Sequence, residues 1–175
     1  HAKVPIVKCR DARTGIPLDI SVNNTLALHN TQLLKTYSMQ DARVSQTILA
    51  IKYWAMCRDV SDAPAGTFSS YAWTLLCIQS MQKTTPPLVA NVQTGKKRNM
   101  QHVEGDDYDV TIPPNPMSLL KQQNQQSLGE IIVNFFETFA NWDWSLDICS
   151  IRNGAALSRE EKGWLEQDPT AIEII

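Results

Sequence analysis

The chain has 175 residues, of which 43% are hydrophobic, and a formal net charge of −2. This composition is that of an ordinary globular protein, and the length allows one domain together with part of another. The sequence contains no long apolar run and no charged-then-apolar leader, so we expect no membrane span or signal peptide and predict a soluble, cytoplasmic protein.

The first predicted elements are two β-runs that end near residue 22. Residues 1–9 alternate like the middle of a sheet and lack an initiating Met, and the chain stops at Ile175 without a helix stop signal, so we expect a piece of a longer protein. The second run, residues 16–22, carries Asp19 among apolar and β-branched residues. A carboxylate on such a rigid element is placed as a metal ligand would be, and the alternative is an edge-strand aspartate that faces water.

Three helices follow, each predicted by apolar residues at helical spacing. They are expected at residues 25–37, 41–58 and 67–82. A turn through residues 61–66 separates the second helix from the third, and Pro86 with Pro87 ends the third.

Residues 90–126 differ in kind, because they are polar and contain charge clusters, prolines and a glutamine-rich stretch. We expect a long surface connection there. The cations at 96–98 are a candidate phosphate contact, although a solvated surface run is the simpler explanation. Asp106, Asp107 and Asp109 also fall in this segment and are not expected to be catalytic.

The last part of the chain begins with a capping box, Ser127 with Glu130, which opens a strongly amphipathic helix. A short β-run at 148–151 and a turn at 153–154 come next. A second capping box at 158–161 predicts a helix through Trp164. The chain has four widely spaced cysteines, Cys9, Cys57, Cys77 and Cys149. They form no Cys-x-x-Cys pair, which argues against a zinc site and against a dense disulfide framework. We expect all four to be buried as small hydrophobic residues.

Several stretches recur in this order in one enzyme family. They are residues 19–31, 51–55 and 66–72, followed by 127–136 and 150–164. On these residues the chain resembles the non-canonical poly(A) polymerase and terminal uridylyltransferase family, which has a polymerase-β-like nucleotidyltransferase palm.

The resemblance implies an α+β fold that is a fragment of a larger chain. Residues 1–22 would be the last strands of the palm sheet, and residues 23–175 a mainly helical central domain. Within that domain, residues 127–166 would form the poly(A)-polymerase-associated segment.

The resemblance also implies a catalytic role for Asp19. Nucleotide addition to an RNA 3′ end uses two divalent ions, Mg2+ or Mn2+, that stabilise the attacking and leaving oxygens. In the family, three carboxylates hold these ions, and Asp19 matches the third. The Asp-x-Asp pair that supplies the first two is absent here, so the chain by itself should be inactive.

Nucleotide contacts are implied by the same resemblance. Asn30 and Thr31 would contact the ribose hydroxyls, with Asn24 nearby, although Asn24 is also a good N-cap and the helix face could simply be solvated. Lys52 would bind triphosphate oxygens. Ser70 would bind the triphosphate at a helix N-terminus, and Tyr71 would stack on the base.

Two departures from the family pattern concern substrate binding. The family often has a second lysine one helical turn after Lys52, where this chain has Met56. The family's base-reading histidine belongs to an Asp-Pro-Phe-Glu segment, and Asp168-Pro169 is followed here by Thr170, so that segment is not matched.

The predicted function is therefore template-independent addition of ribonucleotides to RNA 3′ ends, with UMP favoured and CTP or ATP as alternative substrates. The expected partners are an NTP and an RNA 3′ end. We expect no membrane association and predict a monomeric protein that acts in mRNA processing. An alternative of another class is a non-catalytic RNA- or protein-binding relative. Nucleotide transfer to a small molecule or protein is disfavoured, because the associated segment belongs to RNA-tailing members.

Overall fold

The computed structural model describes residues 5–93, 98–103, 106–112, 119, 123–164 and 172–173. Lys96, Lys97 and the segment from Asp168 to Thr170 lie outside these residues. The helices are α1 (Thr25–Ser38), α2 (Ala42–Cys57), α3 (Ser70–Lys83), α4 (Leu128–Ala140) and α5 (Arg159–Lys162), with a short 3-10 turn, η1 (Ala63–Ala65). The strands are β1 (Ile6–Arg10), β2 (Pro17–Ser21), β3 (Met100–Val103), β4 (Asp106–Asp109), β5 (Asp147–Ser150), β6 (Ala155–Ser158) and β7 (Ile172–Glu173).

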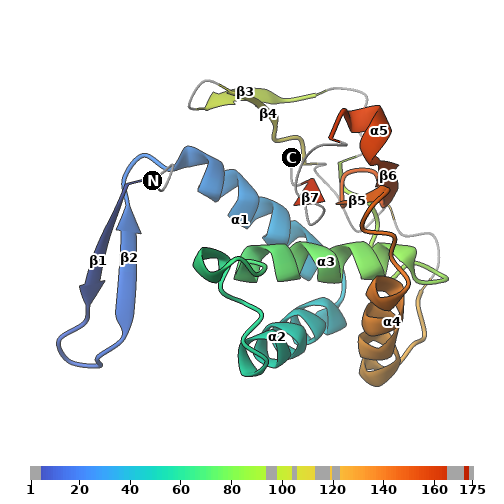
Figure 1. The fold of residues 1–175 in the computed structure, drawn as a ribbon, viewed down its shortest axis with the longest axis horizontal. Coiled ribbons are helices and arrows are strands. Elements are labelled where there is room, and N and C mark those ends of the chain that lie inside the picture. The colour runs from blue at the N-terminus through green and yellow to red at the C-terminus, as the bar shows by residue number, and fades with distance from the viewer. Residues whose placement is uncertain are drawn as a thin grey trace.

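The first two strands form an antiparallel hairpin that extends away from the helices (Figure 1). The register pairs Lys8 with Asp19 and Val7 with Ile20. Because side chains alternate along a strand, Lys8 and Asp19 share one face, and Val7 and Ile20 share the other. Val7 is 63% exposed and Ile20 52% exposed. A lone hairpin of this kind is marginally stable in water, so its apolar face calls for further packing partners.

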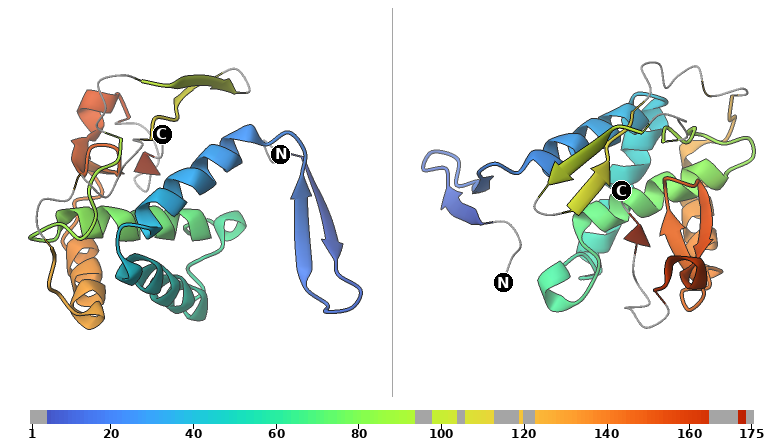
Figure 2. Two further views of the ribbon diagram at one scale, coloured as in Figure 1. Left: turned by 180° about the vertical axis from the view of Figure 1, so that it is seen from behind. Right: turned by 90° about the horizontal axis from the view of Figure 1, so that it is seen from above.

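α3 forms the centre of the helical part (Figures 1 and 2). All its residues from Trp73 to Gln82 are buried, as expected for a helix that has packing partners on several sides. α2 and α4 contact it and each other, and β5 and β6 contact it as well. The helix begins three residues later than the sequence predicted, because Ser69 is its N-cap: the Ser69 hydroxyl accepts a hydrogen bond from the Ala72 amide at 3.0 Å.

An aromatic cluster joins α2, α3 and α4. The ring of Trp73 lies 5.7 Å from that of Trp54, 5.3 Å from that of Phe68 and 6.3 Å from that of Phe135. The Trp73 indole also donates a hydrogen bond to the carbonyl of Val60 at 2.9 Å. Large aromatic side chains contribute much of the apolar area in such cores, so this cluster helps to hold the three helices together.

The expectation of a plain surface connection over residues 90–126 is wrong in part. β3 and β4 form an antiparallel hairpin within it, and Val92, Val110 and Asn124 are buried. Charged and polar residues dominate this segment, but a few side chains in its loops and at the base of the hairpin are buried. Such long-range contacts leave no periodic signal in the sequence.

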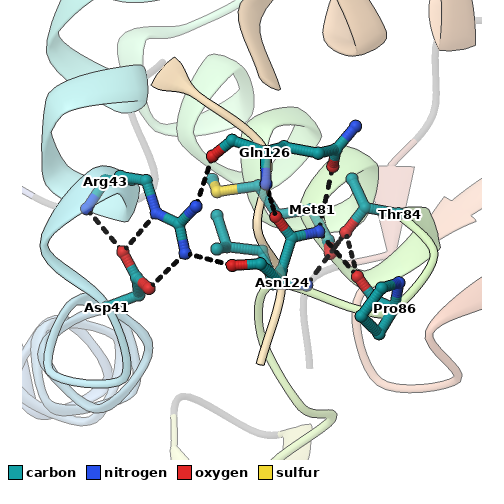
Figure 3. A network of polar contacts seen from close by, with 8 residues as sticks. Asp41, Arg43, Met81, Thr84, Pro86, Asn124 and Gln126 are labelled. Carbon is teal, nitrogen blue, oxygen red and sulfur yellow. Dashed lines mark hydrogen bonds and ion pairs between the residues drawn. The ribbon is translucent and has the colours of Figure 1, made fainter. Parts of the chain in front are cut away.

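Arg43, for which the sequence indicated no role, anchors the segment that precedes α4 (Figure 3). Its guanidinium contacts both carboxylate oxygens of Asp41, at 2.9 and 2.7 Å, and the carbonyl of Asn124 at 2.9 Å. It also donates to the carbonyl of Gln126. The hydrogen bond from Arg43 holds the pKa of Asp41 below its ordinary value. This network connects the start of α2 to the chain that leads into α4.

The capping box that opens α4 is confirmed, since Ser127 and Glu130 bond to each other's backbone amides. The predicted β-run near residue 148 is β5, which pairs antiparallel with β6 and parallel with β7. The predicted helix through Trp164 is shorter than expected. α5 is one turn that ends at Lys162, and its C-cap Gly163 has a left-handed φ of 68°.

The expectation that the cysteines are buried holds for Cys77 and Cys149 and is wrong for Cys9 and Cys57, which are exposed. Burial raises the pKa of both buried thiols. Among the described residues, no helix combines the length and the apolar character needed to cross a bilayer.

Candidate nucleotide and metal site

The candidate site residues come from the hairpin and from α1, α2 and α3. In two opposite views the beginnings of α1 and α3 lie on the side of the helical part that faces the hairpin (Figures 1 and 2). The hairpin carries Asp19, and α1 carries Asn30 and Thr31. The start of α3 carries Ser70 and Tyr71. Residues far apart in the sequence are thus presented from one side of the fold.

Asp19 lies in β2 and is exposed, on the hairpin face that it shares with Lys8. An exposed carboxylate oxygen is a suitable ligand for a hard divalent ion such as Mg2+. Among the residues that the structure describes, no group of three or more His, Cys, Asp or Glu side chains is close enough to hold a metal ion. Asp19 therefore fits a metal site as one ligand and requires others from outside the described part of the chain.

Asn24 is the N-cap of α1, where its side-chain oxygen accepts a hydrogen bond from the Ala27 amide at 3.2 Å. The capping role that the sequence left open is therefore present. The residue before it, Asn23, has a left-handed φ of 60°, a conformation that asparagine tolerates better than most residues. The amide nitrogen of Asn24 remains a donor for a nucleotide contact, and its oxygen keeps a second lone pair.

Asn30 and Thr31 lie in the first half of α1 and differ in their surroundings. The side-chain oxygen of Asn30 is buried and has no hydrogen-bond partner among the described residues. Thr31 is exposed, and its hydroxyl donates to the carbonyl of Ala27 at 2.8 Å, so it retains acceptor capacity. A buried polar atom without a partner is costly, and a bound hydroxyl group would satisfy Asn30.

Lys52 is half-buried on α2. Burial raises the pKa of Cys77 on α3, and the nearby positive charge of Lys52 opposes that rise. α2 itself packs against α3. Met56, where the family often has its second lysine, is 60% exposed. In the fold, as in the sequence, Lys52 lacks that companion.

Ser70 and Tyr71 are the first two residues of α3. Ser69 caps the helix, so the hydroxyl of the exposed Ser70 is left for other contacts. The amides of a first helical turn and the helix dipole favour an anion. Tyr71 is half-buried, and burial raises the pKa of its phenol to about 12. Its hydroxyl has no partner within the described part of the chain.

Sequence reasoning missed three arginines with strong contacts. Besides Arg43, these are Arg152, which pairs with Asp109 at 2.7 Å, and Arg159, which is only 2% exposed and donates to the carbonyls of Trp144 and Trp164. Their partners are distant or are backbone carbonyls, which a sequence pattern does not reveal. For Arg43 alone, the Asp41 two residues earlier at a helix start was a local signal.

Comparison with known proteins shows the class of protein to which the fold belongs. Residues 1–39 match the family described as "Poly(A) RNA polymerase, mitochondrial-like, central palm domain", and residues 127–175 match "Cid1 family poly A polymerase". The crystal structure of the Cid1 poly(U) polymerase superposes with a TM-score of 0.87 at 30% sequence identity, covering 99% of this chain and 56% of that one. The fold is that of part of a polymerase-β-like nucleotidyltransferase.

Curated relatives refine this assignment. Poly(A) RNA polymerase GLD2-B of Xenopus laevis is 38% identical over 169 residues, which are 92% of this chain and 32% of the relative. Poly(A) RNA polymerase cid13 of Schizosaccharomyces pombe is 35% identical over 167 residues, which are 93% of this chain and 29% of the relative. The chain thus spans about a third of these relatives. It belongs to the poly(A) polymerase and terminal uridylyltransferase family, as its sequence motifs predicted.

Proposed function

We propose that the protein to which this chain belongs adds ribonucleotides to RNA 3′ ends without a template. The observation that carries the proposal is the match of nearly the whole chain to the Cid1 poly(U) polymerase fold, with Asp19 on a strand and candidate nucleotide contacts on three helices. Family membership alone would leave open a non-catalytic RNA- or protein-binding relative. The buried oxygen of Asn30, which has no partner among the described residues, and the exposed Ser70 at the start of α3 favour a nucleotide-binding protein.

The roles proposed for the side chains follow from their positions. Asp19 would hold one or both divalent ions, Mg2+ or Mn2+, together with carboxylates from outside the chain. When bound, the two ions stabilise the attacking and leaving oxygens of the displacement at the α-phosphate. Asn30 and Thr31 would bind the ribose hydroxyls. Lys52 and Ser70 would bind the triphosphate, where the amides at the start of α3 add to the attraction.

The nucleotide preference is proposed as UMP, with AMP as the second candidate. Solved structures of similar fold are named as a poly(U) polymerase and a cytoplasmic RNA terminal U-transferase. The curated relatives with the higher sequence identity are instead named poly(A) RNA polymerases. Tyr71 does not decide between these bases, because an aromatic ring stacks on any of them. CTP remains a third candidate.

The deciding experiment uses the intact protein, a short labelled RNA, Mg2+ or Mn2+, and one nucleoside triphosphate at a time. Extension by UTP in preference to ATP and CTP supports the proposal in full. Extension with ATP preferred keeps the RNA-tailing function and replaces the proposed base. No extension with any nucleotide, by protein that still binds the RNA, would instead support the non-catalytic alternative.

Tyr71→Ala tests the proposed base contact. Loss of one stacked base is expected to raise the KM for the nucleotide by about 5- to 150-fold, equivalent to about 1–3 kcal/mol. Tyr71→Phe is the matched control, since it keeps the ring and removes only the hydroxyl that lacks a partner among the described residues. Steady-state kinetics on the intact protein provide the measurement. Equal KM values for the alanine and phenylalanine variants would contradict stacking by Tyr71.

A further inference from the structure

A buried ion pair outside the proposed nucleotide contacts joins two distant parts of the chain. Asp109 ends β4 and is 7% exposed, and Arg152 lies in the turn between β5 and β6. The Arg152 Nη1 atom is 2.7 Å from the Asp109 carboxylate, and Nη2 donates to the Asp109 carbonyl at 3.3 Å. One guanidinium therefore holds both the side chain and the backbone at the base of the β3–β4 hairpin.

The second oxygen of the Asp109 carboxylate also has hydrogen-bond partners. It accepts hydrogen bonds from the amide and hydroxyl of Thr111, and the exposed Arg98 lies 3.7 Å from the first oxygen. Burial raises the pKa of Asp109, but the hydrogen bonds from Thr111 and Arg152 outweigh burial and hold the pKa below its ordinary value. Asp109 is therefore ionised at neutral pH, and its main partner, Arg152, is itself only 17% exposed.

The arginine end of the pair is fixed to the helical core. The Gln82 side chain of α3 donates to the carbonyl of Ile151 at 2.9 Å and to the hydroxyl of Tyr37 in α1 at 3.1 Å. Asn91 donates to the carbonyl of Arg152. The turn that carries Arg152 thus has a fixed position relative to α1 and α3, and the ion pair transmits that position to the β3–β4 hairpin.

The hairpin base in turn lies against the middle of α1. His29 and Leu33 of α1 face Asp109 and Val110 across a cavity of only about 10 Å³. The fully buried residues of α1 are Leu33 and later ones, so the first half of the helix has a smaller share of the core. The hairpin base supports α1 at His29, next to the proposed ribose contacts. Both hairpin and helix are seen in Figure 2, where β3 and β4 lie close to α1.

We propose that Arg152 is a positioning residue for the ribose-binding side chains of α1, acting through Asp109 and the base of the β3–β4 hairpin. This inference rests on the proposed nucleotide-adding function. The hairpin base backs α1 one residue before Asn30, and a small displacement of a binding group has a large effect on selectivity. Loss of the pair would let α1 shift, and the distinction between ribose and deoxyribose would weaken.

The test compares a ribonucleotide with its deoxyribonucleotide in the intact protein. For wild type and Arg152→Met, kcat/KM is measured for the preferred NTP and the matching dNTP on the same RNA. The ratio of the two values is expected to fall by about 5- to 20-fold in the variant, as for a group displaced by less than about 1 Å. A smaller folded fraction lowers both values equally and cancels in the ratio.

Arg43→Met is the matched control. Arg43 also ties a late segment to the helices through an aspartate and backbone carbonyls, but at the start of α2 instead of beside His29. For Arg43→Met, the ratio of kcat/KM for the NTP to kcat/KM for the dNTP should equal that of wild type. Arg152→Lys keeps the positive charge but loses the bidentate contact, so its preference for NTP over dNTP should lie between those of Arg152→Met and wild type.

A double variant, Asp109→Asn with Arg152→Met, leaves no uncompensated buried charge and serves if the single variant fails to fold. Its ratio is expected to fall as well. An unchanged ratio in either variant overturns the proposal, and so does a wild-type enzyme that does not distinguish NTP from dNTP. Wild-type protein that extends RNA with neither nucleotide would show that the proposed function itself has failed, which separates the two failures.

Discussion

Replacing Asp19 with alanine in the intact protein is expected to lower the rate of RNA 3′ extension by about 1,000-fold or more. A divalent ion at a displacement centre contributes several kcal/mol of transition-state stabilisation, and each 1.36 kcal/mol corresponds to about a factor of ten. The side chain is exposed and makes no hydrogen bond in the described part of the structure. Its removal should therefore leave the fold intact, with unchanged circular dichroism and thermal unfolding.

Asp62→Ala is the control for this result. Asp62 is also exposed, and its side chain makes no capping hydrogen bond at η1, so its loss should change neither rate nor stability. Extension of a labelled RNA under saturating Mg2+ or Mn2+ is measured for both variants. Near-normal extension by Asp19→Ala would refute the assignment of Asp19 as a metal ligand.

The largest loss of stability is expected for Phe135→Ala. Phe135 is 2% exposed, and its ring lies 5.3 Å from that of Phe136 and 5.2 Å from that of Phe139. Truncation of a buried phenylalanine costs about 3–5 kcal/mol, from lost apolar burial and the cavity left behind. Because whole domains are stable by only about 5–15 kcal/mol, the variant should be close to unfolding at physiological temperature.

Urea denaturation of the intact protein, followed by tryptophan fluorescence, measures this effect, because Trp73 lies in the same cluster. Val133→Ala on the same helix is the control, since Val133 is 54% exposed and its truncation should change the free energy of unfolding by less than about 0.5 kcal/mol. Similar midpoints for the two variants would show that α4 does not contribute to a common core.

The helices were predictable because each has a local signal. The apolar spacing in α1 and α2 and the capping box of α4 follow from helical geometry, and the observed bounds agree within one residue for α1 and α2. The boundary of α3 was less accurate. Phe68 and Thr67 continue the apolar and polar pattern, but Gly66 has a left-handed φ and Ser69 is the cap, so the turn extends further than periodicity suggests.

The site residues were recognised from motifs, and their roles stay predictions. The structure adds the environment of each: Asn24 caps a helix, Asn30 has a buried oxygen without a partner among the described residues, and Lys52 is half-buried on α2. The partner of Asn24 is local, and the sequence had already indicated this cap. The burial of Asn30 and Lys52 depends instead on packing between elements, which motif residues alone do not reveal.

The sequence by itself determined the family, the order of the four long helices and the candidate side chains, because these depend on local spacing and on motifs of a few residues. Only the tertiary structure decided that Asp109 is a buried partner of Arg152 and not a surface carboxylate, since residues 43 positions apart meet only after folding. The same holds for Arg43, which reaches the segment before α4. Burial and charge pairing at long range are properties of the packed chain, and periodicity does not encode them.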